Sequence, residues 1–365
     1  MFIRPKKPVP EPFVRRTLSD LGYRIDEEDG MVRSIENGEP FAFDQGPSKK
    51  QAMELYNTLI HEASRDVYRI MTDTLGMESI AVPSKDQPHC NIYATPGALS
   101  QEKLVVLVTG NSTFGGVWAW DVLVKSGLGH GSVVEYVRDC GRRGVGVLVL
   151  NPNENIVAPD GVGESFSSYL GRGTAVGGSG TADEHVGYVW SRFLRDGGPR
   201  RIGFVAYNTA GMSVVNLLRY DYARFVDRVA GVAFIDSTHT TSGLGSGSVR
   251  WLGLGAKMWE TFMAPSSQPF DSRAAGCLVV AAENTTQSRG MTPSLCRTSV
   301  LEYLVGRLDE GPVVGAAGFG PGQEVYPSFA AGTNEAAGEA LDTIDAVDIT
   351  QSAGVERSDG YVGWD

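Results

Sequence analysis

Hydrophobic residues follow two different patterns along the chain. Five short runs are almost continuously apolar: 104–109, 146–150, 202–206, 229–235 and 277–281. Such runs are typical of parallel strands that are covered on both faces. Amphipathic helical patterns lie between or after them, near 131–143, 183–196, 211–226 and 292–308. This alternation predicts an α/β fold, a three-layer sandwich with a mostly parallel central sheet, in which ligands bind at the carboxyl ends of the strands.

Two further elements are predicted before the first of these strands. Residues 22–25 and 31–35 flank Asp29-Gly30, a dipeptide suited to the turn of a β-hairpin. Ser48 is a candidate N-cap for a long helix that runs to about Leu75, because apolar residues recur there at three- and four-residue spacing. The fold therefore begins with an N-terminal hairpin and a long helix.

Composition divides the chain into three parts. Residues 1–19 are expected to form an extended arm, since prolines at 5, 8, 10 and 12 remove helix hydrogen bonds; its segment 4–8, Arg-Pro-Lys-Lys-Pro, is similar to a nuclear-import signal. Residues 20–312 form the α/β domain. Residues 313–365 form an acidic, Gly/Ala-rich tail, expected to be disordered or to dock on a basic partner.

Charge and cysteine content exclude several classes of protein. The net charge is −11, and most of the excess lies in the tail, so a general phosphate-binding surface is not expected. No apolar run approaches 18 residues and the N-terminus lacks the apolar core of a signal peptide, which predicts a cytoplasmic or nuclear protein without a membrane segment. The four cysteines are far apart, so neither a disulfide framework nor a metal site is expected, and no motif calls for a cofactor.

The segment 201–211 has the pattern of a nucleophile elbow, the sharp strand-to-helix turn that displays the catalytic serine of α/β-hydrolases. Small residues stand two positions before and two after Asn208, as the turn requires. Asparagine tolerates a positive φ, so the turn itself can survive. However, an amide cannot attack a carbonyl, and the motif therefore lacks its nucleophile.

A serine mechanism also needs a base and an acid. The last of the five histidines is His239, so no histidine follows the final predicted strand. Asp236 stands where the acid is expected, and one interpretation pairs it with His239 and uses Ser237 or Thr209 as nucleophile. The simpler interpretation is that Asp236 caps the next turn and satisfies His239. Thr109 replaces the histidine that often precedes the oxyanion loop.

Polar and aromatic residues near the predicted cleft are candidate binding residues. Asn151, Asn153, Glu154 and Asn155 follow a central strand, where they either line the cleft or tie neighbouring loops together, and the second role is favoured. The aromatic candidates are Tyr207, Trp118 and Trp120; for the two tryptophans a place in the core is favoured over a role as anchor for a peptide or base.

Several stretches, in order along the chain, resemble the Argonaute-binding protein two (Arb) domain family: 22–25, 38–43, 147–155, 184–190, 204–211 and 236–239. The resemblance covers roughly residues 20 to 308 and implies an α/β-hydrolase-like fold, which also occurs as the C-terminal half of some fungal histone deacetylases. It implies a role in RNA silencing, chromatin or RNA processing, chiefly through protein partners. Some members keep His-Ser-x-Gly-Gly at the elbow and a late histidine. Here Tyr207 and Asn208 replace the His-Ser pair, and 282–288 contains no histidine.

Three functions follow as hypotheses. The first is a catalytically inactive hydrolase fold that acts as a protein-interaction module in an RNA-related complex. The second is an unconventional serine or threonine esterase or deacylase that uses His239 and Asp236. The third is binding of RNA or a small ligand in the residual cleft.

Overall fold

The structure is a computed structural model that describes residues 17–42, 49–110, 113–157, 163–164, 173–261, 268–282 and 289–313. The predicted arm lies outside these ranges except for its last three residues, and the predicted tail lies outside them except for Val313. Leu18, in the predicted arm, and Val313, in the predicted tail, are both buried.

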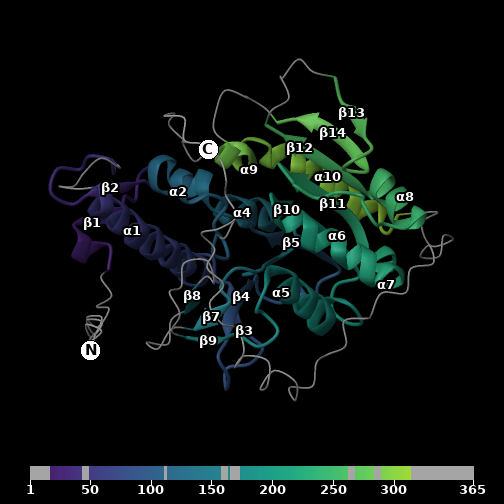
Figure 1. The fold of residues 1–365 in the computed structure, drawn as a ribbon, viewed down its shortest axis with the longest axis horizontal. Coiled ribbons are helices and arrows are strands. Elements are labelled where there is room, and N and C mark those ends of the chain that lie inside the picture. The colour runs from purple at the N-terminus through teal and green to yellow at the C-terminus, as the bar shows by residue number, and fades with distance from the viewer. Residues whose placement is uncertain are drawn as a thin grey trace, which may run out of the picture.

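A sheet of nine strands forms the centre of the molecule (Figure 1). Six neighbouring strands are parallel: β14 (Cys277–Ala281), β12 (Ala256–Glu260), β11 (Val229–Ile235), β10 (Arg201–Tyr207), β5 (Lys103–Val108) and β6 (Gly146–Val149). Antiparallel strands complete both edges: β13 (Phe270–Ser272) on one side, and β4 (Cys90–Ala94) and β3 (Glu78–Val82) on the other. The mostly parallel sheet confirms the predicted fold class.

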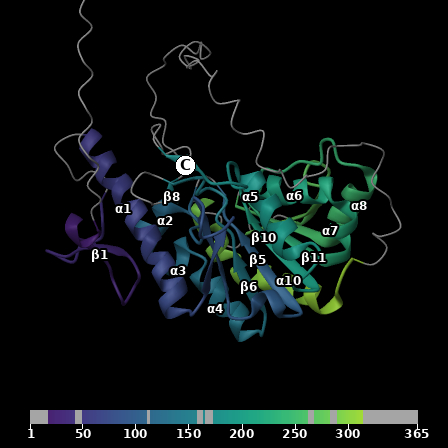
Figure 2. The same ribbon diagram turned by 90° about the horizontal axis from the view of Figure 1, so that it is seen from below.

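Helices cover both faces of this sheet, which makes a three-layer sandwich (Figure 2). One face carries α5 (Ala182–Val189), α6 (Ala210–Tyr220), α7 (Tyr222–Arg228) and α8 (Ser246–Gly255). The other carries α1 (Lys49–Arg69), α2 (Trp120–Ser126), α4 (Val134–Arg142) and α10 (Arg297–Glu310). Alternate residues of each central strand enter the two resulting cores: Phe204 and Ala206 face one, while Val205 and Tyr207 face the other.

The N-terminal hairpin and long helix are also present. β1 (Tyr23–Ile25) pairs antiparallel with β2 (Val32–Ser34), and the turn reaches a positive φ of 69° at Gly30. Helix α1 continues through a π-helical turn, η2 (Ile70–Thr74), and buries Leu59, Val67 and Met71. The proposed N-cap, Ser48, lies outside the described residues.

The remaining elements are short. They are η1 (Ser19–Leu21), η3 (Ala98–Ser100), α3 (Leu128–Gly131), η4 (Trp190–Leu194), η5 (Arg289–Met291), α9 (Thr292–Leu295), and the three-stranded sheet of β7 (Ile156–Val157), β8 (Gly163–Glu164) and β9 (Thr174–Ala175). The predicted helix 211–226 is divided at Asp221, whose carboxylate accepts hydrogen bonds from Trp190 Nε1 and Arg195 Nε. Helix α8 begins at Ser246, inside the Gly/Ser-rich stretch 242–248.

Candidate functional site

The elbow between β10 and α6 has the backbone of a nucleophile turn. Asn208 lies in the left-handed region with φ of 52°, one of only two non-glycine residues with positive φ in the described parts of the chain. Its N–H donates to Ile235 O at 2.9 Å, and its carbonyl accepts from Gly211 N at 3.2 Å and Thr238 N at 3.3 Å. These bonds hold the strained residue from both sides. The sequence prediction of the turn at Asn208 is therefore confirmed.

The Asn208 side chain occupies the position of a nucleophile, but its amide cannot attack a carbonyl. The residue is 7% exposed, and its amide makes no hydrogen bond with any described residue. Thr209, the next residue, is exposed at the start of α6. Thr209 is therefore the hydroxyl-bearing residue next to the nucleophile position, and its Oγ1 lies close to Gly110.

The loop after β5 packs directly on the elbow. A Cβ atom added at Gly110 would lie 2.3 Å from the carbonyl oxygen of Tyr207, so only glycine fits there. Thr109, at the end of the strand, is buried, and its hydroxyl donates to Phe114 O at 3.4 Å. At the position where many hydrolases have a histidine, this threonine therefore forms a hydrogen bond within its own loop. The next two residues, 111 and 112, lie outside the described ranges.

Asp236, at the carboxyl end of β11, has a structural network of its own. It is buried and is the second non-glycine residue with positive φ, at 42°. Its carboxylate accepts hydrogen bonds from Thr261 N at 2.8 Å, Thr261 Oγ1 at 2.7 Å and Thr292 Oγ1 at 2.6 Å. These donors join the end of β12 to the start of α9. The position that orients the histidine in a hydrolase here connects two distant segments.

His239 is held by different partners from those of Asp236. Its Nε2 lies 2.9 Å from Ala275 O, which can only accept, so Nε2 carries the proton and Nδ1 accepts from Ser237 Oγ at 2.8 Å. The ring also stacks on Phe234 at 3.8 Å between centroids. Burial lowers the pKa of His239 below its ordinary value, and the bond to the Ala275 carbonyl partly opposes this shift.

Asp236 and His239 are therefore not joined to each other, which differs both from the dyad and from the simpler interpretation in which Asp236 satisfies His239. The Asp236 carboxylate binds Thr261 and Thr292, whereas the His239 ring binds Ser237 and Ala275, because the two side chains point in different directions from the short turn. Ser237 does contact His239, but its hydroxyl is packed against α6: a Cβ added at Gly211 would lie only 1.9 Å from Ser237 Oγ. Ser237 is 8% exposed, so this hydroxyl is closed to a substrate carbonyl.

The Asn-Pro-Asn-Glu-Asn block after β6 ties loops together. Asn151 is fully buried; its Oδ1 accepts from Gly115 N at 2.8 Å, and its Nδ2 donates to Tyr68 OH at 3.2 Å and to Glu154. Its backbone N–H donates to His185 Nε2 at 3.1 Å. This one residue thus links β6 to helices α1 and α5 and to the loop before α2.

The other amides of the block act in the same way. Asn153 Nδ2 donates to Thr113 O at 2.8 Å, and Asn155 Nδ2 donates to Pro152 O at 2.9 Å and Ser179 O at 2.7 Å. Asn155 is buried, whereas Asn153 and Glu154 are partly exposed. The geometry supports the loop-organising interpretation over a cleft lined by Asn151 and Asn155.

A buried histidine cluster beside this block was missed by sequence reasoning. His185 is fully buried; because Nε2 accepts from Asn151, Nδ1 carries the proton and donates to Ser179 Oγ at 2.7 Å. Cys90 Sγ lies 3.7 Å from the same nitrogen. Burial lowers the pKa of His185 to about 3 and raises that of Cys90 to about 12. The only available signal was a histidine in an otherwise amphipathic helix.

The aromatic candidates belong largely to the core, which is the role favoured from the sequence for the two tryptophans. Trp118 and Tyr207 are 1% and 2% exposed and pack edge to face with centroids 6.1 Å apart. Trp118 also packs on Tyr136 at 5.3 Å. Trp120 is only partly buried and lies against Phe114 at 6.0 Å, so it is the one of the three that keeps some surface.

Within the described residues, three or more His, Cys, Asp or Glu side chains nowhere gather in a group that could hold a metal ion. No helix in those parts has the length and hydrophobicity needed to cross a membrane. All four cysteines are free and buried, in agreement with the absence of a C-x-x-C spacing.

Solved structures match the chain at low similarity. A histone deacetylase from Saccharomyces cerevisiae superposes with a TM-score of 0.44 at 12% identity over 68% of this chain and 98% of that chain. An α/β-hydrolase-fold protein of unknown function gives a TM-score of 0.36 at 10% identity over 64% of this chain and 96% of that chain.

Sequence relatives cover most of the chain. The cotranscriptional regulator ARB2A of Mus musculus is 24% identical over 317 residues, which is 73% of this chain and 75% of the relative. The model of the Arb2 domain matches residues 14–265 and includes the elbow, the Asn151 block and the Asp236–His239 segment. The chain belongs to the Arb2 domain family.

Proposed function

We propose that this protein is a catalytically inactive hydrolase fold that acts as a protein-interaction module in a nuclear, RNA-related complex that regulates gene expression. The proposal of inactivity rests on one observation: the residues at the positions of a hydrolase's catalytic groups have structural roles here. Asn208 holds the elbow, Asp236 binds Thr261 and Thr292, and His239 is held by a carbonyl and a buried hydroxyl.

The regulatory part of the proposal is supported by the relatives. The mouse relative is named a cotranscriptional regulator, not an enzyme. A fold that retains its elbow without a nucleophile keeps a rigid scaffold whose surface can be used for binding. Nuclear action also fits the basic segment 4–8, which lies outside the described residues.

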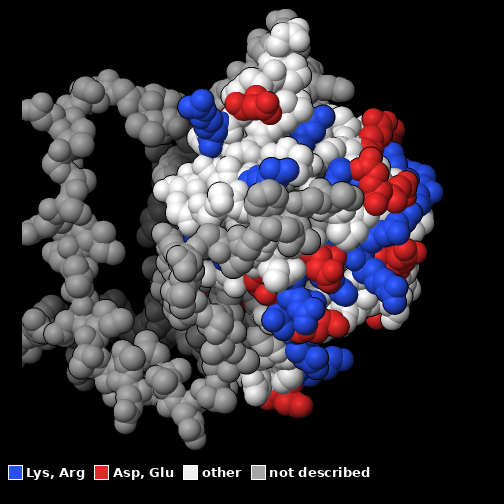
Figure 3. Space-filling model, turned by 90° about the vertical axis from the view of Figure 1, so that its right-hand side faces the viewer, with Lys and Arg blue, Asp and Glu red and all other residues white. Residues whose placement is uncertain are grey.

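Direct RNA binding is less well supported. In Figure 3, Lys and Arg side chains lie interspersed with Asp and Glu, and no extended positive surface is seen on this face. Two arginines are already ion-paired: Arg195 with Asp196 and Asp221, and Arg224 with Asp196. Nucleic-acid surfaces need unpaired cations that contact successive phosphates. A protein partner therefore fits this face better than RNA.

An esterase or deacylase remains the second candidate because the Ser237–His239 hydrogen bond is of the kind that activates a nucleophile. The burial of Ser237 against α6 argues against it. Thr209 is exposed at the start of α6, but both ring nitrogens of His239 are bonded elsewhere, to Ser237 and to the Ala275 carbonyl.

Affinity purification of the full chain from nuclei tests the proposal. We expect RNA-processing or transcription proteins to co-purify, and the same set to co-purify with the Thr209→Ala and Ser237→Ala variants, since neither hydroxyl is needed for binding. A tag-only bait is the control. If these proteins were not enriched over the control, the interaction role would be wrong. If Ser237→Ala abolished their recovery while the fold was retained, the hydroxyl would be needed for binding and the proposal of an inactive site would be wrong.

A further inference from the structure

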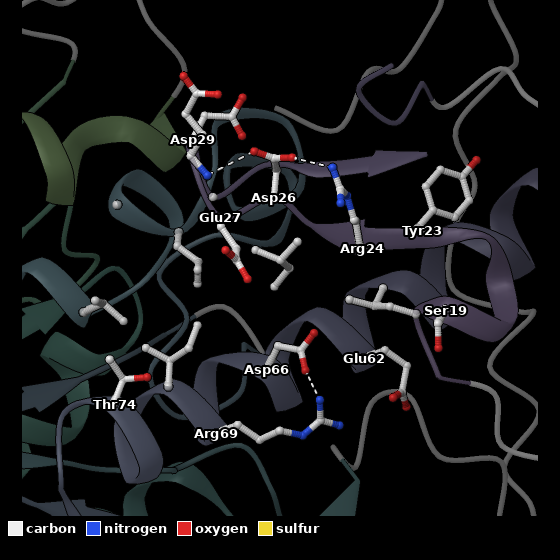
Figure 4. Close-up of a pocket in the computed structure, with 18 of the residues that line it drawn as sticks. Ser19, Tyr23, Arg24, Asp26, Glu27, Asp29, Glu62, Asp66, Arg69 and Thr74 are labelled. Atoms are coloured by element: carbon white, nitrogen blue, oxygen red, sulfur yellow. Dashed lines mark hydrogen bonds and ion pairs between the residues drawn. The ribbon is translucent and has the colours of Figure 1, made fainter. Parts of the chain in front are cut away.

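A large pocket lies between the N-terminal hairpin and helix α1, far in sequence from the elbow. Its volume is about 940 Å³, and its lining also includes residues of α3 and α4. Figure 4 shows Asp26, Glu27 and Asp29 on the hairpin side and Glu62 and Asp66 on the α1 side. The carboxylates therefore come from two elements that face each other across the same space.

The lining is strongly negative. Seven carboxylates line the pocket against three guanidinium groups: Asp26, Glu27, Glu28, Asp29, Glu62, Asp66 and Glu135 against Arg24, Arg69 and Arg138. Each of these arginines already has a carboxylate partner in the lining: Asp26 for Arg24, Asp66 for Arg69 and Glu135 for Arg138. The cations of the pocket therefore leave part of its negative charge without compensation.

Glu27 and Glu28 carry this uncompensated charge most clearly. Both are exposed at the tip of the hairpin, and neither carboxylate forms an ion pair or hydrogen bond with a described residue. Asp29 and Glu62 differ, because Arg33 and Arg65 pair with them. A cationic segment that entered the pocket would meet Glu27 and Glu28 without having to displace an existing partner.

The chain supplies such a segment at the edge of this pocket. Thr17, the first described residue, is itself part of the lining. The sixteen residues before it contain five cationic side chains, Arg4, Lys6, Lys7, Arg15 and Arg16, and one carboxylate, Glu11. An extended chain of that length spans at most roughly 55 Å, enough to return across a pocket that begins at its own attachment point.

We propose that the acidic pocket between the hairpin and α1 is the docking site of the chain's own basic segment, residues 1–16. Attachment at Thr17 gives that segment an effective concentration on the order of millimolar at the pocket, so individually weak ion pairs suffice. The interaction is electrostatic and therefore sensitive to salt. While docked, the segment 4–8 is withheld from other binding partners. This inference does not depend on whether the elbow is catalytically inactive.

Zero-length carbodiimide cross-linking of the full chain, followed by mass spectrometry, tests the proposal. The reagent joins a lysine amine to a carboxylate only when the two are in contact. We expect Lys6 and Lys7 to be joined to Glu27, Glu28, Glu62 or Asp66, with a yield that does not depend on protein concentration. The yield should fall strongly between about 0.1 M and about 1 M NaCl, as the Debye length drops from roughly 10 Å to roughly 3 Å.

A matched pair of variants locates the site. Glu27→Lys with Glu28→Lys should lower cross-linking of Lys6 and Lys7 to Glu62 and Asp66 by about fivefold or more. Glu302→Lys, on the exposed face of α10, makes a similar surface change and should have no effect. All three positions are exposed, so the variants are expected to fold.

Three results would overturn the proposal. One is that Lys6 and Lys7 are joined mainly to the acidic tail. Another is a yield that rises with protein concentration, which would mean that the segment docks on a second copy. The last is a yield that the Glu27→Lys, Glu28→Lys variant leaves unchanged.

Discussion

The Asp236 carboxylate accepts a hydrogen bond from the Thr292 hydroxyl at 2.6 Å, across 56 positions of sequence. The same carboxylate binds the backbone and hydroxyl of Thr261, so the ends of β11 and β12 and the start of α9 meet at one buried charge. Thr292 is fully buried. The place where a hydrolase holds its histidine is therefore occupied by a structural junction.

The first prediction concerns this junction. Asp236→Asn keeps the shape and tolerates the positive φ, but it places an amide N–H₂ or a neutral oxygen where the charged acceptor was. We expect a loss of about 1–3 kcal/mol in the free energy of unfolding. Urea denaturation measures it. Asp271→Asn on β13, where the residue is exposed, is the matched control and should change stability by less than about 0.5 kcal/mol. Equal losses in the two variants would mean that the junction does not stabilise the fold.

The second prediction separates a loop-organising Asn151 from a ligand-binding one. Asn151→Ala leaves Gly115 N without its acceptor and Tyr68 OH without its donor, all in a buried site, and we expect a loss of about 2–4 kcal/mol. Asn153→Ala removes only one bond, to Thr113 O, from a partly exposed residue and should cost about 1 kcal/mol. Thermal or urea unfolding of both variants provides the comparison. An Asn151→Ala variant of normal stability would contradict the structural role.

The third prediction concerns pH. The folded-state pKa of His185 is lowered to about 3, whereas an unfolded histidine titrates near about 6.5. Below about pH 6.5 the unfolded chain binds a proton that the folded chain does not, so stability falls as pH falls from there toward 3. His185→Gln keeps a donor and an acceptor but does not titrate. Between about pH 6.5 and about 5.5, the wild type should lose about 1 kcal/mol more than this variant. Parallel loss in both proteins would show that His185 is accessible to protons.

The fourth prediction concerns the cysteines. All four are buried, and burial raises the pKa of Cys90, Cys140 and Cys277 to about 12. Since the thiolate is the reactive species, a thiol reagent at pH 8 should modify none of them within minutes in the folded protein. All four should react in concentrated guanidinium chloride. Rapid reaction of even one thiol in the native state would show that its burial is incomplete.

Strands that are buried on both faces were predicted correctly from the sequence. A strand whose polar residue is accommodated by contacts with other side chains was missed. The strands 229–235 and 277–281 agree with β11 and β14 to the residue, because covered parallel strands are continuously apolar. β12 was missed because its Lys257 interrupts the apolar pattern. In the fold, the Lys257 ammonium lies over the rings of Trp259 and Tyr303, at 5.2 and 5.9 Å from their centroids.

The candidate site was predictable only in part. The elbow at Asn208 follows from local sterics, small residues around a sharp turn, and local patterns carry that information. The partners of Asp236 lie 25 and 56 positions away, and those of His239 include a carbonyl 36 positions away. Such contacts depend on the arrangement of whole strands. For this reason Asp236 and His239, three positions apart in sequence, resembled a dyad but have different hydrogen-bond partners in the structure.

The measurement that tests the inactive elbow most directly is fluorophosphonate labelling, with ester turnover, of the purified full chain. We predict no covalent adduct and no turnover above buffer for the wild type. The same is expected for Asn208→Ser, because both ring nitrogens of His239 are already bonded to Ser237 and Ala275. An adduct on the wild type that disappears in Ser237→Ala or Thr209→Ala, together with turnover that disappears in the same variant, would contradict the account and establish an enzyme.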